Sequence, residues 1–300
     1  MRPLLRSFLI LPFCFCFYLL FCLPSAYPAE KGLYITDEVQ LKVGDTFMEE
    51  GEYYRAITEY KKLLILFPDS DRADYALFRI GMAYYQGEEY EQSVRSFSSL
   101  NGKYPESAYL SESSYFQGLG YWKLKQFENA RTAFDTLAET CPQSEFAPLA
   151  LVAASLVSLE EGNIPVSTQR LERLIDRYPD HPVSAHGREA IPLLDQYEKL
   201  PQKSKTLAGV LSAILPGSGY IYAGRYGDGI TAFLINALWI AGVVTGISAE
   251  YYAVAGIVAG VGVPFYLGNI YGSANAVQKW NLNLKRDVRN RVYLTLEFKF

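Results

Sequence analysis

The sequence predicts an all-α protein in two parts, an α-solenoid of helical hairpins followed by a C-terminal bundle of transmembrane helices, with a short terminal β-strand or hairpin. Three observations lead to this fold class. Four prolines recur at a step of 37 residues through the middle of the chain. Three long stretches without any charge follow after residue 205. The last nine residues alternate between apolar and polar side chains.

The first element, residues 1–29, has the order of a secretory signal peptide. Two arginines precede the apolar run 8–23, and small residues follow it. That order predicts export of everything after it, with an uncleaved anchor as the alternative. The bulky Phe21 before Cys22 fits a lipoprotein signal poorly, so we expect no lipidation.

The second element, residues 30–199, is predicted to be a solenoid. Its repeats are expected at about 37–70, 74–107, 111–144 and 148–181, with a capping helix over 182–199. Each repeat holds two amphipathic stretches joined by a polar turn, which is the pattern of a helical hairpin. Several residue types keep the same step: Pro68, Pro105, Pro142 and Pro179; Gly44, Gly81 and Gly118; Tyr60, Phe97 and Phe134.

These residues resemble the tetratricopeptide repeat (TPR), with a small residue at the eighth position, aromatic residues at the eleventh and twenty-fourth, and proline near the end. The extra residues per repeat and the [FYC]-P-x-[SH] ending resemble the variant found in periplasmic proteins of the Tol-Pal system and of outer-membrane assembly. The fourth repeat departs from the pattern, with Ser155 and Ser158 in place of the glycine and the aromatic residue.

The TPR resemblance implies a concave groove, lined by the first helix of each hairpin, that receives a segment of a partner protein. Aromatic anchors of this kind are common in binding hot spots. Packing between the repeats is the alternative role for the same side chains. The implied groove residues are Tyr75, Phe78, Met82, Tyr85, Tyr115, Leu119 and Trp122.

Charge and composition argue against several functions. The net charge is −11 over residues 30–200 and +5 over residues 201–300, and an acidic exported domain is a poor nucleic-acid binder. The two histidines, His181 and His186, have too few neighbouring ligands for a metal site. No nucleophile, base and orienting group stand together, so we expect no enzyme, no cofactor and no metal.

The third element is a linker over 200–206, and the fourth is a membrane domain over 207–278. The uncharged stretches cover 206–224, 229–249 and 251–278, and the last two exceed the roughly 20 residues needed to cross a bilayer. Glycines four residues apart predict close packing of the transmembrane helices. These glycines are Gly242, Gly246, Gly256 and Gly260.

The stretch "LPGSGYIYAGRYGDG" at 215–229 has glycines close to the spacing of a phosphate-binding loop. A dinucleotide-binding loop needs a preceding strand and a third glycine at the Gly-x-Gly-x-x-Gly spacing, and here the third glycine comes too late. A Walker-type phosphate loop needs a Lys-Ser/Thr pair, which is also missing, so no nucleotide is expected. The motif resembles a Pro-Gly-x-Gly-x-x-Tyr-x-Gly segment of small bacterial membrane modules, including the two-transmembrane-helix family. It predicts a broken helix whose freed backbone groups neighbouring helices must satisfy. The motif residues are Pro216, Gly217, Gly219, Tyr222, Gly224 and Gly229.

The last element, residues 279–300, is a basic tail. Alternation from Val292 to Phe300 predicts a strand, which could pair with "WNLNL" at 280–284 as a hairpin. Four basic residues between 285 and 291 favour a cytoplasmic tail after three crossings. A re-entrant turn at Pro216 would instead give two crossings and an external tail.

The sequence therefore predicts a non-enzymatic envelope scaffold. Its exported groove would bind protein partners, and its C-terminal helices would anchor it in the lipid bilayer of the bacterial inner membrane. The alternative is an accessory subunit of a membrane transport or export system in which the helical bundle is the active part. The absence of ionisable residues inside the uncharged stretches disfavours that alternative.

Overall fold

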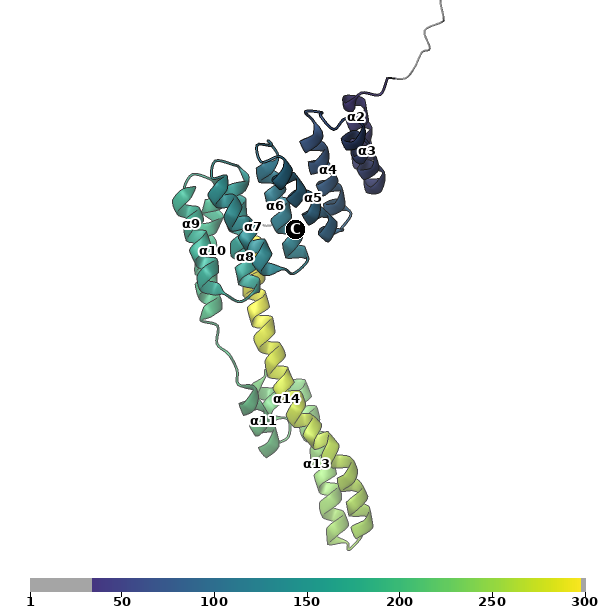
Figure 1. Ribbon diagram of the computed structural model, residues 1–300. Coiled ribbons are helices and arrows are strands. Elements are labelled where there is room, and N and C mark those ends of the chain that lie inside the picture. Colours follow the sequence, from purple (N-terminus) through teal and green to yellow (C-terminus); the bar gives the residue numbers. More distant parts are fainter. Residues whose placement is uncertain (1–33, 298–300) are drawn as a thin grey trace, which may run out of the picture.

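The computed structural model describes residues 34–297, and it consists of a curved stack of helical hairpins above a long helical rod (Figure 1). The predicted signal peptide and the final Phe298 and Phe300 lie outside the described residues. All regular secondary structure in the described range is helical, as the sequence predicts. The protein is thus an all-α chain with TPR-like hairpins.

Nine helices form the stack. Each of the first four hairpins places its second helix against both its own first helix and the next hairpin. The elements are α2 (Asp37–Glu49), α3 (Tyr53–Leu66), α4 (Ala73–Gln86), α5 (Tyr90–Lys103), α6 (Leu110–Lys123), α7 (Phe127–Thr140), α8 (Phe146–Glu160), α9 (Ile164–Arg177) and α10 (Pro182–Glu198).

The repeated glycines exist because an aromatic ring lies directly on the helix backbone. A Cβ added at Gly81 would lie 2.5 Å from the ring of Phe97. The same 2.5 Å relationship joins Gly44 to Tyr60 and Gly118 to Phe134. Real Cβ atoms do not approach a neighbour this closely, so each of these three hairpins can close only over a glycine.

The serine of the proline loop ties the end of a repeat to its beginning. Ser70 Oγ donates a 2.6 Å hydrogen bond to Asp37, and Ser107 Oγ donates one of the same length to Asp74. Asp37 and Asp74 both lie in the first turn of the first helix of their repeats. The hydrogen bond from Ser70 also lowers the pKa of Asp37.

The fourth hairpin has a different interior. Residues 147–159 of α8 are buried except for the half-buried Leu149, so this helix is apolar on every side. Ser155 stands where the earlier hairpins have the glycine, Leu171 stands where they have the aromatic ring, and Ser155 Oγ lies 2.9 Å from Ser167 Oγ. An apolar helix of this kind needs cover on all faces. Helices α7, α9 and α10 supply part of that cover.

The C-terminal part has two short and two long helices: α11 (Lys205–Ile214), α12 (Ser218–Tyr222), α13 (Tyr226–Ser248) and α14 (Tyr252–Thr295). At about 1.5 Å per residue, α11 is only about 15 Å long, too short to cross a bilayer. The first of the three membrane crossings expected from the sequence is therefore not formed by a helix that could span a bilayer. Helices α13 and α14 are both long and apolar enough to cross a membrane, judged by length and composition alone.

Helix α14 corrects the predicted terminal strand. Residues 280–295 all continue its single helix of 44 residues, so neither a strand over 292–295 nor a hairpin with "WNLNL" forms. The alternation predicted a strand wrongly because residues four positions apart lie on the same face in a strand and in a helix. Val288, Val292 and Leu296 are buried at this spacing, whereas Leu294 is 77% exposed. The pattern therefore belongs to one face of a helix.

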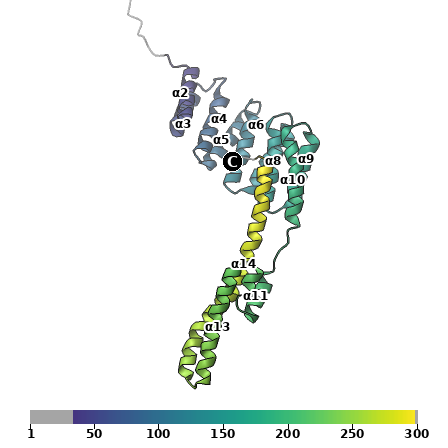
Figure 2. The same ribbon diagram turned by 180° about the vertical axis from the view of Figure 1, so that it is seen from behind.

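The rod and the solenoid meet at the C-terminal end of α14. In both views this end runs back to the stack and lies beside α8 and α10 (Figure 1 and Figure 2). Val292 and Leu296 join the same core cluster as Leu151 and Leu194. The last turns of α14 thus complete the cover of the apolar fourth hairpin.

Candidate functional site

The seven predicted groove residues fall into two groups. Tyr75, Met82 and Tyr85 are half-buried on α4. The other four are buried, so they offer little surface to a partner in this conformation: Phe78, Tyr115, Leu119 and Trp122. Only the three residues on α4 therefore keep partly exposed side chains among the seven that the resemblance assigned to a groove.

The buried aromatic residues pack between hairpins. Phe78 stacks on Tyr109 at a centroid distance of 5.2 Å, and Tyr115 lies 5.5 Å from Phe146. Tyr85 meets Phe116 edge-on at 5.3 Å. Such ring pairs stabilise the contact between successive hairpins. This packing is the alternative role that the sequence left open for the same side chains.

The C-terminal end of α14 covers Trp122. The carboxylate of Glu160 accepts a 2.8 Å hydrogen bond from Trp122 Nε1 and a second 2.8 Å bond from the Tyr293 hydroxyl. Burial and the Glu160 charge raise the pKa of Tyr293, so the phenol stays protonated as a donor. Sequence reasoning missed this contact because it assigned Tyr293 to a strand.

A polar network joins Tyr75 on α4 to neighbouring charged residues. Arg79 forms a 3.0 Å ion pair with Asp45, and the Tyr60 hydroxyl donates a 2.6 Å hydrogen bond to the same carboxylate. Tyr75 lies at the edge of this network, with its hydroxyl 3.5 Å from Asp45. The network fixes Arg79 and Tyr75 on neighbouring turns of α4, where both side chains are half-buried.

One carboxylate in this region has a raised pKa. Partial burial of Glu112, together with the nearby charge of Glu145, raises the pKa of its carboxyl group, while Arg79 opposes the shift. Burial also raises the pKa of the Tyr85 phenol to about 12. The region around α4 and the start of α6 therefore combines aromatic rings with acidic groups and the paired cation Arg79.

The glycine motif at 216–229 is a tight turn closed by side chains. Gly217 has a φ of +88°, and a Cβ there would lie 2.0 Å from the carbonyl oxygen of Gly229. Its N–H donates to Asn269 Oδ1 at 3.1 Å, and Gly219 N–H donates to Ser212 Oγ at 3.1 Å. These two N–H groups are already bonded within the fold, so the turn is not a phosphate cradle.

The other motif residues support the same turn. A Cβ at Gly219 would lie 2.1 Å from the carbonyl oxygen of Ala208, and Gly224 has a φ of +83°. The Tyr222 hydroxyl accepts a hydrogen bond from Ser204 N–H at 3.1 Å. Pro216 is buried. The motif therefore joins α11, α12 and α13 through direct backbone contact.

Of the four glycines predicted to pack the transmembrane helices together, two lie at the contact between α13 and α14 and two do not. A Cβ at Gly242 would lie 3.1 Å from Val258, and one at Gly246 would lie 3.0 Å from Ala255, so both glycines face α14. Gly256 and Gly260 would meet nothing within 4 Å and lie away from the contact, unlike the expectation. Gly262, which the sequence reasoning missed, takes their place against Trp239 at 3.0 Å.

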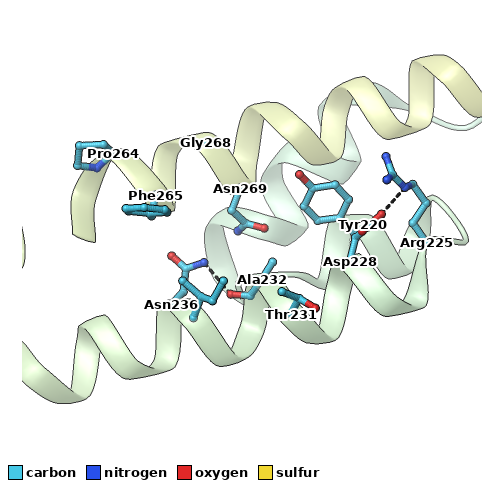
Figure 3. Close-up of a pocket in the computed structure, with 11 residues that line it drawn as sticks. Tyr220, Arg225, Asp228, Thr231, Ala232, Asn236, Pro264, Phe265, Gly268 and Asn269 are labelled. Atoms are coloured by element: carbon cyan, nitrogen blue, oxygen red, sulfur yellow. Dashed lines mark hydrogen bonds and ion pairs between the residues drawn. The ribbon is translucent and has the colours of Figure 1, made fainter. Parts of the chain in front are cut away.

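A cavity of about 510 Å³ lies between α12, α13 and α14 (Figure 3). Arg225, Asp228 and Tyr220 lie at one end, and Asn236 and Asn269 approach each other across the gap between the long helices. Arg225 and Asp228 form an ion pair. This concentration of polar groups is unusual beside two apolar helices, and apart from the two asparagines no pattern in the sequence indicates it.

The histidines have local roles. His181 Nδ1 accepts a 3.4 Å hydrogen bond from Val183 N–H and caps α10. His186 Nε2 lies 3.9 Å from Glu297 at the end of the described chain. Among residues 34–297, no cluster of three potential metal ligands occurs.

The solenoid region matches a known protein family. Residues 36–196 match the YfiO family, described as an outer membrane lipoprotein, and this match covers more than half of the chain. The chain belongs to the YfiO family. The YfiO match ends within α10, so it covers the hairpins and not the membrane-like part. No curated relative matches the chain significantly.

Solved TPR structures resemble the chain at low identity. A tetratricopeptide repeat protein from Parabacteroides merdae is 15% identical, with 85% of this chain and 98% of that chain covered and a TM-score of 0.46. PilF from Pseudomonas aeruginosa is 12% identical, with 82% and 97% covered and a TM-score of 0.42. MamA (41-end) from Desulfovibrio magneticus RS-1 is 17% identical, with 49% and 78% covered and a TM-score of 0.41. Likenesses at these identities concern the fold alone.

Proposed function

We propose that the protein is a non-enzymatic scaffold of the bacterial cell envelope. Its open groove over α2, α4 and α6 would bind a protein partner, while α13 and α14 would anchor it in a bilayer. Membership of the YfiO family supports an envelope role, and the hairpin stack is a protein-interaction fold. The finer resemblances to Tol-Pal repeats and to two-helix membrane modules belong to this proposal.

One observation carries the proposal, namely that α14 runs unbroken from an exposed apolar hairpin into the solenoid core. Only a small share of the most apolar window of α13 is buried. Large side chains on it face outward, among them Phe233, Leu234 and Leu238. Such an apolar surface on two adjacent helices would be costly in water and favourable in lipid.

The contact between tail and solenoid favours two crossings. Because α11 is too short to span, α13 would cross once and α14 would return to the side of the solenoid. The hairpin turn at Ala249–Tyr251 would then lie on the opposite face, where Glu250, Tyr251 and Tyr252 suit an interface. With the solenoid exported, we place the hairpin in the inner membrane, the solenoid and tail in the periplasm, and Glu250 on the cytoplasmic side.

Two features indicate which partner segment the groove accepts. Half-buried Tyr75 and Tyr85 supply aromatic surface, and the solenoid is strongly acidic. Glu112 forms no ion pair among the described residues, and burial raises the pKa of its carboxyl group. A segment that brings a Lys or Arg toward Glu112 and an apolar side chain toward Tyr85 would satisfy both groups.

Site-specific photocrosslinking in living cells tests the groove. A photoreactive residue at Tyr75 or Glu112 is expected to trap a defined partner. Gln92 and Ser99 on α5 are exposed outside the groove and serve as matched control sites. Equal crosslinking from groove and control sites, or none from the groove sites, would contradict the proposal.

A further inference from the structure

The cavity between α12, α13 and α14 has a charged end and an apolar side. Arg225 and Asp228 lie one turn apart at the start of α13, and their side chains are about half exposed. Phe265 and Ile235 line the same cavity and are 52% and 38% exposed. The cavity is therefore open toward the surface that the proposed function places in lipid.

Asn236 lies inside this cavity with unused hydrogen-bonding capacity. Its residue is only 3% exposed, and its Nδ2 donates one hydrogen bond to the Ala232 carbonyl at 2.7 Å. The second N–H of Nδ2 has no acceptor, and Oδ1 has no donor, among the described residues. Oδ1 is not fully enclosed by the fold, so this unused hydrogen-bonding capacity opens to the cavity and suits a polar ligand group.

The spacing along α13 sets the length of the ligand. Asp228 and Asn236 are eight residues apart, which corresponds to about 12 Å along the helix axis. Thr231 lies between them on the cavity wall. A molecule with opposite charges at one end and a polar group about two helical turns deeper would contact all three side chains.

We propose that this cavity binds one zwitterionic phospholipid, with phosphatidylethanolamine as the chemical class that fits best. Arg225 would bind the phosphate, because a guanidinium donates in a bidentate geometry that suits phosphate oxygens. Asp228 would accept hydrogen bonds from the ammonium group. The free N–H of Asn236 would donate to a glycerol ester carbonyl, and the acyl chains would lie over Phe265 and Ile235.

Charge complementarity favours this lipid over an anionic one. Arg225 and Asp228 sum to zero charge, as do the phosphate and ammonium of the headgroup. Their separation by one helical turn places the two protein charges side by side, like those of the lipid. An anionic headgroup would leave Asp228 facing a negative phosphate without an ammonium partner.

The inference rests on the proposed membrane anchoring, and its test distinguishes a failure of the lipid site from a failure of the anchoring. The full chain is reconstituted in nanodiscs that contain equal amounts of phosphatidylethanolamine and phosphatidylglycerol, and retained lipid is counted by native mass spectrometry after detergent exchange. We expect one phosphatidylethanolamine per chain. If the chain does not enter nanodiscs at all, the anchoring proposal fails and the lipid site that rests on it fails too, whereas a chain that enters nanodiscs without retaining phosphatidylethanolamine overturns the lipid site alone.

Variants locate the lipid. Asp228→Asn and Asn236→Leu are each expected to lower the retained fraction about tenfold, whereas Glu250→Gln at the far end of α13 leaves it unchanged. Gly268→Leu keeps the ion pair and fills the cavity from α14, where an added Cβ meets nothing within 4 Å. It is expected to exclude the lipid while the variant remains folded in thermal unfolding. Equal retention by wild type and Gly268→Leu, or preferential retention of phosphatidylglycerol, would overturn the proposal.

Discussion

Tyr293 donates a 2.8 Å hydrogen bond to Glu160 across 133 positions of sequence, and the same carboxylate accepts a hydrogen bond from Trp122. The contact joins the last turn of α14 to the last turn of α8. It makes the C-terminal segment part of the solenoid core and not a free tail. The orientation of the solenoid relative to the helical rod follows from this one junction.

Truncation of Leu296 tests the junction. Leu296 is 3% exposed in the core cluster, so Leu296→Ala is expected to lower the free energy of unfolding by about 2–4 kcal/mol. Leu294→Ala is a matched control, because Leu294 is 77% exposed and should change stability by less than about 0.5 kcal/mol. Denaturant unfolding of the full chain in detergent measures both. Equal losses would indicate that the two residues share a face, as a strand requires.

The glycine and ring pairs predict an unusual response to a single methyl group. Gly81→Ala places a Cβ 2.5 Å from Phe97 and is expected to destabilise the solenoid by about 1–3 kcal/mol. Gly102→Ala, in the neighbouring helix α5, meets nothing within 4 Å and should stabilise by about 0.5–1 kcal/mol through helix propensity. Thermal unfolding distinguishes the two, and a stabilising Gly81→Ala would refute this packing.

The turn at Gly217 is expected to tolerate no side chain. Gly217→Ala combines a positive φ with a Cβ 2.0 Å from the carbonyl oxygen of Gly229, so we expect α11 and α12 to lose their packing against α14. Gly227→Ala has open space and is the control. Limited proteolysis within residues 205–225 is the measurement. A Gly217→Ala protein as resistant as the control would contradict the described turn.

Replacement of Glu112 by a neutral residue is expected to increase the stability of the fold, by an amount that depends on pH. Because burial and Glu145 raise its folded-state pKa, its ionised form destabilises the fold above that pKa. Glu112→Gln is therefore expected to raise the melting temperature at pH 7.5. The gain should shrink as the pH falls toward the unfolded-state pKa of Glu, about 4.3, because the native carboxyl is then protonated. The exposed Glu49→Gln is the control, and a gain that persists at low pH would contradict the assigned cause.

Much of the solenoid follows from the sequence because its determinants are local and repeated. Gly81, Phe97 and Pro105 define one hairpin, and the same step defines its neighbours. The shared contact of Trp122 and Tyr293 with Glu160 could not be predicted in this way, since Tyr293 lies at the far end of the chain. The terminal strand was wrong for a related reason. Val292 and Leu296 satisfy both periods, and only the contact with α8 decides between them.

The membrane-like part was predictable in composition but not in detail. The length of α13 follows from the uncharged run after Asp228, whereas the short α11 follows from a backbone break at Pro216. The acceptors that make this break possible, such as Asn269, come from a helix about fifty residues away. No local pattern reveals such a partner. The same holds for the cavity that contains Asn236.

Side-specific labelling tests the central claim most directly. Single cysteines at Ser99, Asn290 and Glu250, in a Cys141→Ala background, are exposed to a membrane-impermeant maleimide on spheroplasts. We predict that Ser99→Cys and Asn290→Cys react from the outside, while Glu250→Cys reacts only after lysis. Labelling of Asn290→Cys only after lysis would place the tail across the membrane from the solenoid and contradict both the junction and the two-crossing anchor.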